Sequence, residues 1–302
     1  MVCCMAKVIS IVSVFSLFLL PSAAIIGSAA AALYMGVPLD PIVLITAWAI
    51  VFGIYGLNRF TDVEDMINNP EKRMFFKKHP SILISVVATL VISTIILLFT
   101  HRFTIVHFLI LLAGIAYSIR ILPVFQKNSG ITFKRLKEIP FAKSVTVAII
   151  WGNAFFTINL ALYPNLQSST FEIILLIICF TLVTFVNTNF LDCADVIGDK
   201  KNGIPTFPAR YGVKSTIIYF IGLPSFVWLV IVLYCFKEGF ITDTITIFLL
   251  INALFPVFYI GGYFSKLIPE KTVEIAADSC AFVFSIGLLC LYFIRENVLF
   301  FN

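Results

Sequence analysis

The chain has 302 residues, of which 60% are hydrophobic and only 12% are charged. Soluble domains carry about 25% charged residues, so too few polar side chains are present to cover a soluble protein of this size. The formal charge of +5 would suit nucleic-acid binding, but the basic residues lie in short loops between apolar runs, and no nucleic acid is expected as a partner. The lipid bilayer is therefore the expected solvent.

Apolar runs of about 20 residues, long enough to cross a bilayer, recur along the whole chain. They predict an all-α, multi-pass transmembrane bundle of about nine helices, formed by a single domain over residues 1–302. The first run continues to Met35, past a typical signal peptide, so we expect it to remain as the first helix. The nine predicted helices lie at residues 8–34, 39–57, 80–100, 103–120, 142–163, 171–191, 214–236, 242–263 and 275–299.

The connections between these helices differ in length and charge on the two sides of the membrane. The long, basic loops lie at residues 58–79, 121–141, 192–213 and 264–274. Their side holds every Lys and Arg of the chain except Arg102, Lys237 and Arg295. Because cytoplasmic loops are rich in Lys and Arg, we expect the four long loops and the N-terminus to be cytoplasmic.

The loop at 192–213 begins with three aspartates. Asp192, Asp195 and Asp199 fall at i, i+3 and i+7, so a helix that continued through them would present all three on one face. Three carboxylates on one face repel one another unless a cation lies among them. Mg²⁺ takes oxygen ligands and commonly binds through carboxylates together with substrate phosphates. The spacing therefore indicates a cation site.

The loop at 58–79 carries a similar set after the second helix. Asn58, Asp62 and Asp65 lie at i, i+4 and i+7 and would share a helical face, with Glu64 rotated away from it. One acidic cluster at a membrane boundary is most often a solvated helix end. Two clusters on one side, with six of the chain's 16 acidic residues, favour metal ions that hold a diphosphate between the loops.

Basic residues near these clusters are candidates for binding diphosphate oxygens, Arg through bidentate bonds and Lys as a point charge. They are Lys72, Arg73, Lys137, Lys143, Lys200 and Lys201. Cytoplasmic loops are basic in any case, so each single residue fits a purely topological role equally well. Tyr117 and Trp151, near predicted helix ends, fit either an aromatic belt or a cavity wall.

Together these residues resemble the UbiA superfamily of intramembrane prenyltransferases, over roughly residues 40–215. The second loop is similar to that family's second Asp-rich motif and reads Asp192-x-x-Asp195-x-x-Gly198-Asp199-x-x-x-Gly203-Ile-x-Thr206-x-Pro208. The first loop resembles the first motif and reads Asn58-x-x-x-Asp62-x-x-Asp65, followed by Ile67-Asn68-x-Pro70 and Arg73. The segments between them that look like the family are Ala116-Tyr117-Ser118, Arg135-Leu136-Lys137 and Lys143 through Trp151-Gly152.

The resemblance implies a bundle around a central cavity that opens to lipid, where Mg²⁺ holds an isoprenyl diphosphate. The implied metal ligands are Asn58, Asp62, Asp65, Asp192, Asp195 and Asp199. The implied catalytic carboxylates are Asp62, Asp65, Asp192 and Asp195. The implied substrate contacts are Asn58, Arg59, Arg73, Tyr117, Lys137, Lys143, Asn189 and Lys200. Loss of diphosphate would give an allylic cation, which family members pass to a small lipophilic acceptor, often an aromatic ring.

Two positions depart from the family pattern. Arg59 stands where the family usually has Asp, and Asp65 follows Asp62 by three residues instead of four. Arg59 could bind diphosphate directly or reflect altered metal use. The same site would suit a terpene cyclase, in which the cation reacts with its own chain. A transporter or lipid-binding protein is a third alternative, disfavoured because the predicted helix interiors lack ionisable residues at mid-membrane.

Overall fold

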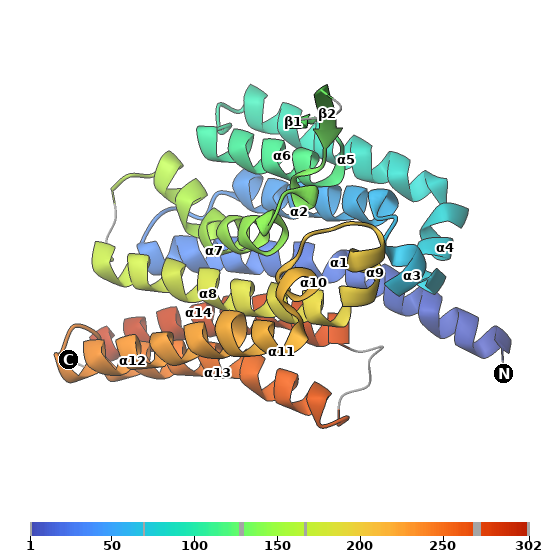
Figure 1. Cartoon of the computed structure of the whole chain (residues 1–302). Helices are drawn as coiled ribbons and strands as arrows, with labels where there is room; N and C mark the ends of the chain where they lie inside the picture. Colours follow the sequence, from blue (N-terminus) through green and yellow to red (C-terminus); the bar gives the residue numbers. More distant parts are fainter. Residues whose placement is uncertain (1, 69, 127–129, 166–167, 268–272, 301–302) are drawn as a thin grey trace.

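The computed structural model is a bundle of long helices joined by loops that contain short helices and one hairpin (Figure 1). It describes residues 2–68, 70–126, 130–165, 168–267 and 273–300. The long helices are α1 (Val2–Met35), α2 (Pro41–Thr61), α5 (Pro80–Phe99), α6 (Ile105–Ser118), α7 (Ala142–Leu162), α8 (Thr170–Ala194), α12 (Leu223–Lys237), α13 (Asp243–Phe264) and α14 (Val273–Phe300). The shorter elements are α3 (Asp65–Asn68), α4 (Pro70–Lys78), β1 (Leu122–Gln126), β2 (Gly130–Lys134), the 3-10 turn η1 (Leu136–Glu138), α9 (Val196–Lys201), α10 (Phe207–Tyr211), α11 (Val213–Thr216) and the π-helical turn η2 (Ile217–Gly222).

Eight helices in the described part of the chain are long and apolar enough to cross a membrane. The ninth predicted helix, α6, is apolar but has only 14 residues. At 1.5 Å per residue it is about 21 Å long, less than the hydrocarbon core of about 30 Å. Thr104 caps its start through the His107 amide, which shortens the predicted run at 103–120. The predicted all-α bundle of about nine helices is confirmed.

The first and last helices of the chain lie side by side, because α1 packs against both α2 and α14. In Figure 1 the N-terminus lies at the right, on the side of α3, α4 and α9, and the C-terminus lies at the left. The N-terminus therefore shares a side with the two Asp-rich loops, as the loop alternation predicts. That this side faces the cytoplasm stays a prediction.

The connection at 121–141 contains an antiparallel hairpin that was not predicted. β1 pairs with β2, with Val124 opposite Thr132. The β-branched and aromatic residues of both strands favour this extended conformation. The chain then passes through η1 into the first turn of α7. This connector, residues 137–143, begins with Lys137 in η1 and ends with Lys143, the second residue of α7.

The helices that surround the bundle centre pack through aromatic side chains and one close backbone contact. The ring of Phe180 stacks on Phe284 at 4.1 Å and on Phe155 at 5.5 Å, which joins α8, α14 and α7. A Cβ atom on Gly152 would lie 2.5 Å from the Cα atom of Thr181. Glycine therefore allows α7 and α8 to approach each other closely.

Candidate active site

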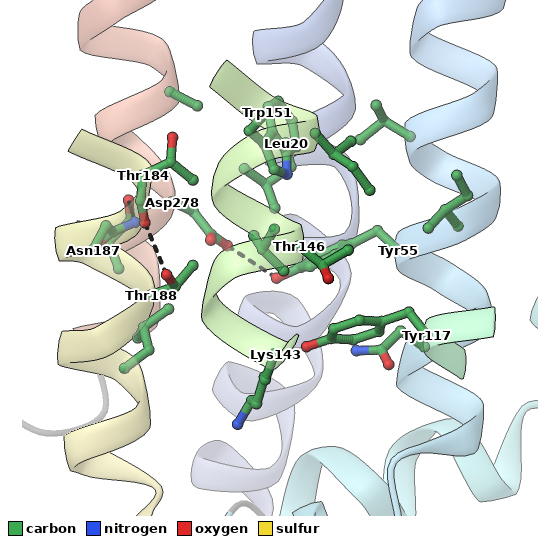
Figure 2. Close-up of a pocket in the computed structure, with 18 of the residues that line it drawn as sticks. Leu20, Tyr55, Tyr117, Lys143, Thr146, Trp151, Thr184, Asn187, Thr188 and Asp278 are labelled. Carbon is green, nitrogen blue, oxygen red and sulfur yellow. Dashed lines mark hydrogen bonds between the residues drawn. The ribbon is translucent and has the colours of Figure 1, made fainter. Parts of the chain in front are cut away.

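A cavity of about 1260 Å³ lies among α1, α2, α6, α7, α8 and α14, in agreement with the predicted central cavity. Apolar side chains such as Leu20, Trp151 and Phe155 form much of its wall, and residues of both Asp-rich loops also line it. Figure 2 shows Trp151 and Leu20 toward one end of the view and Lys143 and Tyr117 toward the other. The cavity thus combines an apolar region with a strongly charged one.

The first Asp-rich loop does not continue α2, contrary to prediction. The helix ends at Thr61, and Asp62 adopts an extended conformation before α3 starts at Asp65. Arg73 donates hydrogen bonds to the carbonyls of Arg59 and Phe60. Because these contacts satisfy carbonyl groups at the end of α2, they favour its termination there.

Arg135 also binds a carbonyl group at the end of α2, and it contacts an acidic residue of the first loop. Its Nη1 donates to the Thr61 carbonyl at 3.2 Å, and its Nη2 lies 3.6 Å from Glu64 Oε2. Glu64 was expected to be rotated away from the site, and this expectation is wrong. It is 4% exposed and lines the cavity, because the chain turns at Asp62 instead of following a helix.

Lys137 lies behind the first loop and contacts its carboxylates. Its Nζ atom contacts Asp62 Oδ1, lies 2.5 Å from Glu64 Oε1 and lies 3.5 Å from Asn58 Oδ1. The side chain is 1% exposed and is not part of the cavity wall. Burial would raise the pKa of Glu64, but the charges of Lys137 and Arg135 lower it overall. For Asp62, burial outweighs Lys137 and raises the pKa.

The second Asp-rich loop is nearly continuous with α8, as predicted. α8 ends at Ala194 and α9 begins at Val196, with Asp195 at the junction. Lys143 Nζ lies 2.8 Å from Asp192 Oδ1 and 3.1 Å from Asp199 Oδ2, so these two aspartates face the same way.

Hydroxyl groups complete the binding of these two buried carboxylates. Ser144 Oγ donates to Asp192 at 2.6 Å, and Thr206 Oγ1 donates to Asp199 at 3.2 Å. Asp192 and Asp199 are 1% and 0% exposed. Each therefore has a charged and a neutral donor, as a buried carboxylate requires.

Asp195 lines the cavity and has no ion pair with the described residues. Burial is the largest cause that raises the pKa of Asp195 to about 7 and that of Asp199 to about 6. In each case the opposing effect of Lys143 is smaller. Burial thus makes the charged form of both carboxylates costly, and a nearby cation would offset this cost.

Asn68 connects the two Asp-rich loops directly. Its Nδ2 donates to the Asp195 carbonyl at 3.3 Å, and its Oδ1 accepts from the Gly198 amide at 3.0 Å. A Cβ atom on Gly198 would lie only 2.2 Å from Asn68 Oδ1. The short side chain of Asn68 and the glycine together fix how closely the loops approach.

Most of the residues predicted for the site line the cavity, namely Asn58, Arg59, Asp62, Asp65, Tyr117, Lys143, Asp192 and Asp195. Asp199 is not part of the cavity wall, but it contacts Lys143, which is. The structure does not bring the side chains of Arg73, Asn189 and Lys200 to the cavity wall. Arg73 binds helix carbonyls, Asn189 is fully buried with its Nδ2 donating to the Phe185 carbonyl, and Lys200 is exposed.

Arg59, the unusual residue of the first motif, is 5% exposed and points at a residue of its own helix. Its guanidinium lies 4.3 Å from the Tyr55 ring centroid, and its Nη2 donates to Tyr55 Oη. Tyr55 in turn lies 3.3 Å from Asp278 Oδ2. Neither Tyr55 nor Asp278 was predicted for the site. The available signal was an acidic residue near the start of the last apolar run.

The residues at the two loops fit Mg²⁺ in chemical type. Aspartate oxygens from both loops line one cavity, and the raised pKa values of Asp62, Asp195 and Asp199 indicate buried negative charge that a divalent cation would stabilise. Within the described ranges, no three His, Cys, Asp or Glu side chains form a metal-holding group. Lys137 and Lys143 contact the carboxylates there.

Comparison with known proteins gives a family match over most of the chain. The UbiA prenyltransferase family model matches residues 19–268. The apo structure of a UbiA homolog from Aeropyrum pernix K1 is similar, with 15% identity, a TM-score of 0.53 and coverage of 91% of this chain and 97% of that one. A structure of digeranylgeranylglyceryl phosphate synthase aligns at 15% identity and a TM-score of 0.49, covering 92% and 99% of the two chains. No curated protein matches.

Proposed function

Because the chain belongs to the UbiA prenyltransferase family, we propose that it ionises an isoprenyl diphosphate and transfers the prenyl chain to a small lipophilic acceptor. The observation that carries this proposal is one cavity lined by aspartates of both loops and, elsewhere, by apolar side chains. The charged region suits a diphosphate, and the apolar region suits a hydrocarbon chain. Eight spanning helices and the family make this a multi-pass membrane protein, so both substrates can enter from lipid.

We further propose Mg²⁺ as the cofactor. Its ligands would come from Asn58, Asp62 and Asp65 on the first loop and from Asp192, Asp195 and Asp199 on the second. When bound, the ion would supply positive charge to the diphosphate oxygens as the leaving group departs. Family prenyltransferases generally use a divalent metal in this way.

The two lysines of the connector would have different roles. Lys143 lines the cavity, so its ammonium can reach a diphosphate oxygen while it binds Asp192 and Asp199. Lys137 is buried behind Asp62 and Glu64, so we assign it to positioning the first loop. Apolar walls, with Tyr117 near the charged end, would exclude water from the allylic cation.

Diphosphate release by the purified protein tests this proposal. Reactions would contain Mg²⁺ and prenyl diphosphates from C10 to C20, with and without an aromatic acceptor. They would compare the wild type with Asp62→Asn, Asp195→Asn and the control Asp40→Asn. Asp40 is also buried, but it binds Arg102 and Tyr163 away from the cavity wall. We expect release to fall by roughly 100-fold or more in the first two variants, and to remain near wild type in the control.

The products separate the alternatives. Absence of release from folded wild-type protein would refute the enzymatic proposal. A hydrocarbon formed without an acceptor would identify a terpene cyclase instead of a transferase. We also propose that the Asp-rich loops face the cytoplasm, because their side is basic. Labelling of Lys200→Cys by an impermeant maleimide from the cytoplasmic side only would support this orientation, and labelling from the other side only would contradict it.

A further inference from the structure

The hairpin formed by β1 and β2 exposes an apolar face. The side chains of Phe125, Phe133 and Ile131 are 83%, 59% and 56% exposed. Pro123 is also exposed and lies directly opposite Phe133, so it belongs to the same face. Val124, on the other face of the hairpin, is half-buried. In a hairpin surrounded by water the exposed face would carry polar residues, so this face suits an apolar environment.

No other part of the described structure covers this face. Among the described elements, β1 and β2 pack chiefly against each other. Figure 1 shows the hairpin projecting from the outer edge of the bundle, at the top of the view. A two-stranded hairpin alone is at best marginally stable in water. Contact of its apolar face with a further surface would therefore stabilise it.

The base of the hairpin is held in place by charged residues. Arg120 precedes β1 and Arg135 follows β2, and both bind Glu138. Arg120 Nη2 lies 3.0 Å from Glu138 Oε1, and Arg135 Nε lies 2.8 Å from the same oxygen. Arg135 also donates to the Thr61 carbonyl at the end of α2. The hairpin is thus attached to the bundle on the side of the Asp-rich loops.

The length of α6 places this base near the edge of the lipid. With 14 residues, α6 is about 21 Å long. A chain that enters a hydrocarbon core of about 30 Å at the start of α6 is therefore still roughly 9 Å from the opposite boundary when the helix ends. The exposed side chains of α6, such as Phe108 and Leu112, are apolar, and Ile119 and Ile121 continue this exposed apolar surface toward β1. The hairpin therefore begins at the lipid boundary and not in bulk water.

The interfacial region of the bilayer fits the hairpin better than the hydrocarbon core does. The edges of a two-stranded sheet keep unpaired amide and carbonyl groups, which hydrocarbon does not tolerate. The interface supplies water to these groups, and aromatic side chains concentrate there. Amphipathic helices in this region bury their apolar face by about 5–10 Å, a depth that the side chains of a hairpin can also reach.

We propose that the apolar face of the hairpin, formed by Pro123, Phe125, Ile131 and Phe133, inserts into the interfacial region of the bilayer on the side of the Asp-rich loops. The partner of this surface is therefore phospholipid, at the level where headgroups meet acyl chains. This contact lies outside the cavity and does not depend on the proposed prenyl transfer.

Spin labels on the hairpin test this proposal in phosphatidylcholine nanodiscs. A nitroxide is attached to Phe125→Cys or Phe133→Cys, and its collisions with molecular oxygen, which concentrates in lipid, and with a water-soluble nickel chelate are measured by power saturation. The control sites are Lys200→Cys, exposed on the second Asp-rich loop, and Leu112→Cys, exposed in the middle of α6. Because Cys179, Cys193, Cys235 and Cys280 are buried, the background protein carries only the changes Cys3→Ser, Cys4→Ser and Cys290→Ser.

We expect the ratio of oxygen to nickel collisions at both hairpin sites to exceed that at Lys200→Cys by at least about ten-fold, and to stay below that at Leu112→Cys. Thr132→Cys, on the half-buried face, should give a lower ratio than Phe133→Cys. A ratio equal to that at Lys200→Cys would place the face in water and overturn the proposal. A ratio equal to that at Leu112→Cys would place it in the hydrocarbon core and overturn the interfacial assignment. Few collisions with either reagent would indicate a protein contact, such as a second copy of this chain, in place of lipid.

A second arm tests whether the aromatic side chains hold the hairpin at the interface. The nitroxide is placed at Ile131→Cys, and Phe125→Ser and Phe133→Ser are introduced together, with circular dichroism as a check of the fold. The ratio of oxygen to nickel collisions should fall to the level of Lys200→Cys, because the face has lost its two largest apolar side chains. An unchanged ratio in folded protein would refute their role. Neither arm depends on diphosphate release, so failure of this inference leaves the proposed function untouched.

Discussion

Replacing Lys143 by methionine removes one ammonium group from between two buried carboxylates and keeps an unbranched side chain of similar length. In the structure this ammonium lies 2.8 Å from Asp192 and 3.1 Å from Asp199, which are almost completely buried. Ser144 and Thr206 each donate only one neutral hydrogen bond to them. The Lys143→Met protein therefore has two carboxylates without their shared cation.

Removing one partner of a buried ion pair typically costs about 3–5 kcal/mol, because the other charge remains buried. At roughly 2–4 °C per kcal/mol, this corresponds to a melting temperature about 10 °C lower. Mg²⁺ should restore part of the loss, because a ligand that binds only the folded state stabilises it by mass action. Lys200→Met is the matched control, since Lys200 is exposed and should change stability by less than about 0.5 kcal/mol.

Thermal unfolding in detergent, followed by circular dichroism with and without Mg²⁺, measures these differences. The double variant Lys143→Met/Asp199→Asn should be more stable than Lys143→Met, because it carries one uncompensated carboxylate fewer. If metal-free Lys143→Met melts at the same temperature as Lys200→Met, the two carboxylates do not depend on this lysine and the reasoning is refuted.

Three further changes test other parts of the structure. Asn68→Ala should lower the free energy of unfolding by about 1–3 kcal/mol, because the Gly198 amide loses its acceptor and the Asp195 carbonyl keeps only the Asp199 amide as a donor; a loss no larger than that of an exposed substitution would contradict the bridge. Gly152→Ala should cost more than about 3 kcal/mol, because its Cβ would overlap Thr181, whereas Gly261→Ala, which meets nothing within 4 Å, should not. The raised pKa values of Asp195 and Asp199 mean that the folded protein keeps protons that the unfolded chain releases. The stability of the metal-free protein should therefore fall as pH rises from about 4 to 7, with a smaller slope in Asp195→Asn; an equal slope in that variant would show that Asp195 does not contribute.

The membrane helices could be predicted because the bilayer imposes a length and a composition on each one. The prediction was least accurate where local hydrogen bonds decide the end of a helix. Thr104 shortens α6 by capping its start, although the apolar run begins earlier. The end of α2 depends on Arg73 and Arg135, which reach back to carbonyls at residues 59–61 from later segments. The spacing of residues in the sequence does not reveal such contacts between distant segments.

The same limit applies to the candidate site. The second motif was placed well, because α9 begins only two residues after α8 ends and Lys143 contacts both Asp192 and Asp199. The first was placed less well, since the turn at Asp62 brings Glu64 into the cavity. Lys137 and Lys143 look equivalent in the sequence, yet only Lys143 lines the cavity. Packing decides such differences between residues of the same type.

The connector between the hairpin and α7 has a consequence for how this chain can change in length. Lys137 contacts the carboxylates of the first loop and Lys143 those of the second, so the five residues between these lysines determine how far apart the two loops stay. Phe141 lies between them with a φ of 65°, a left-handed conformation that fixes the path of this segment. An insertion or deletion here would detach one loop from its lysine.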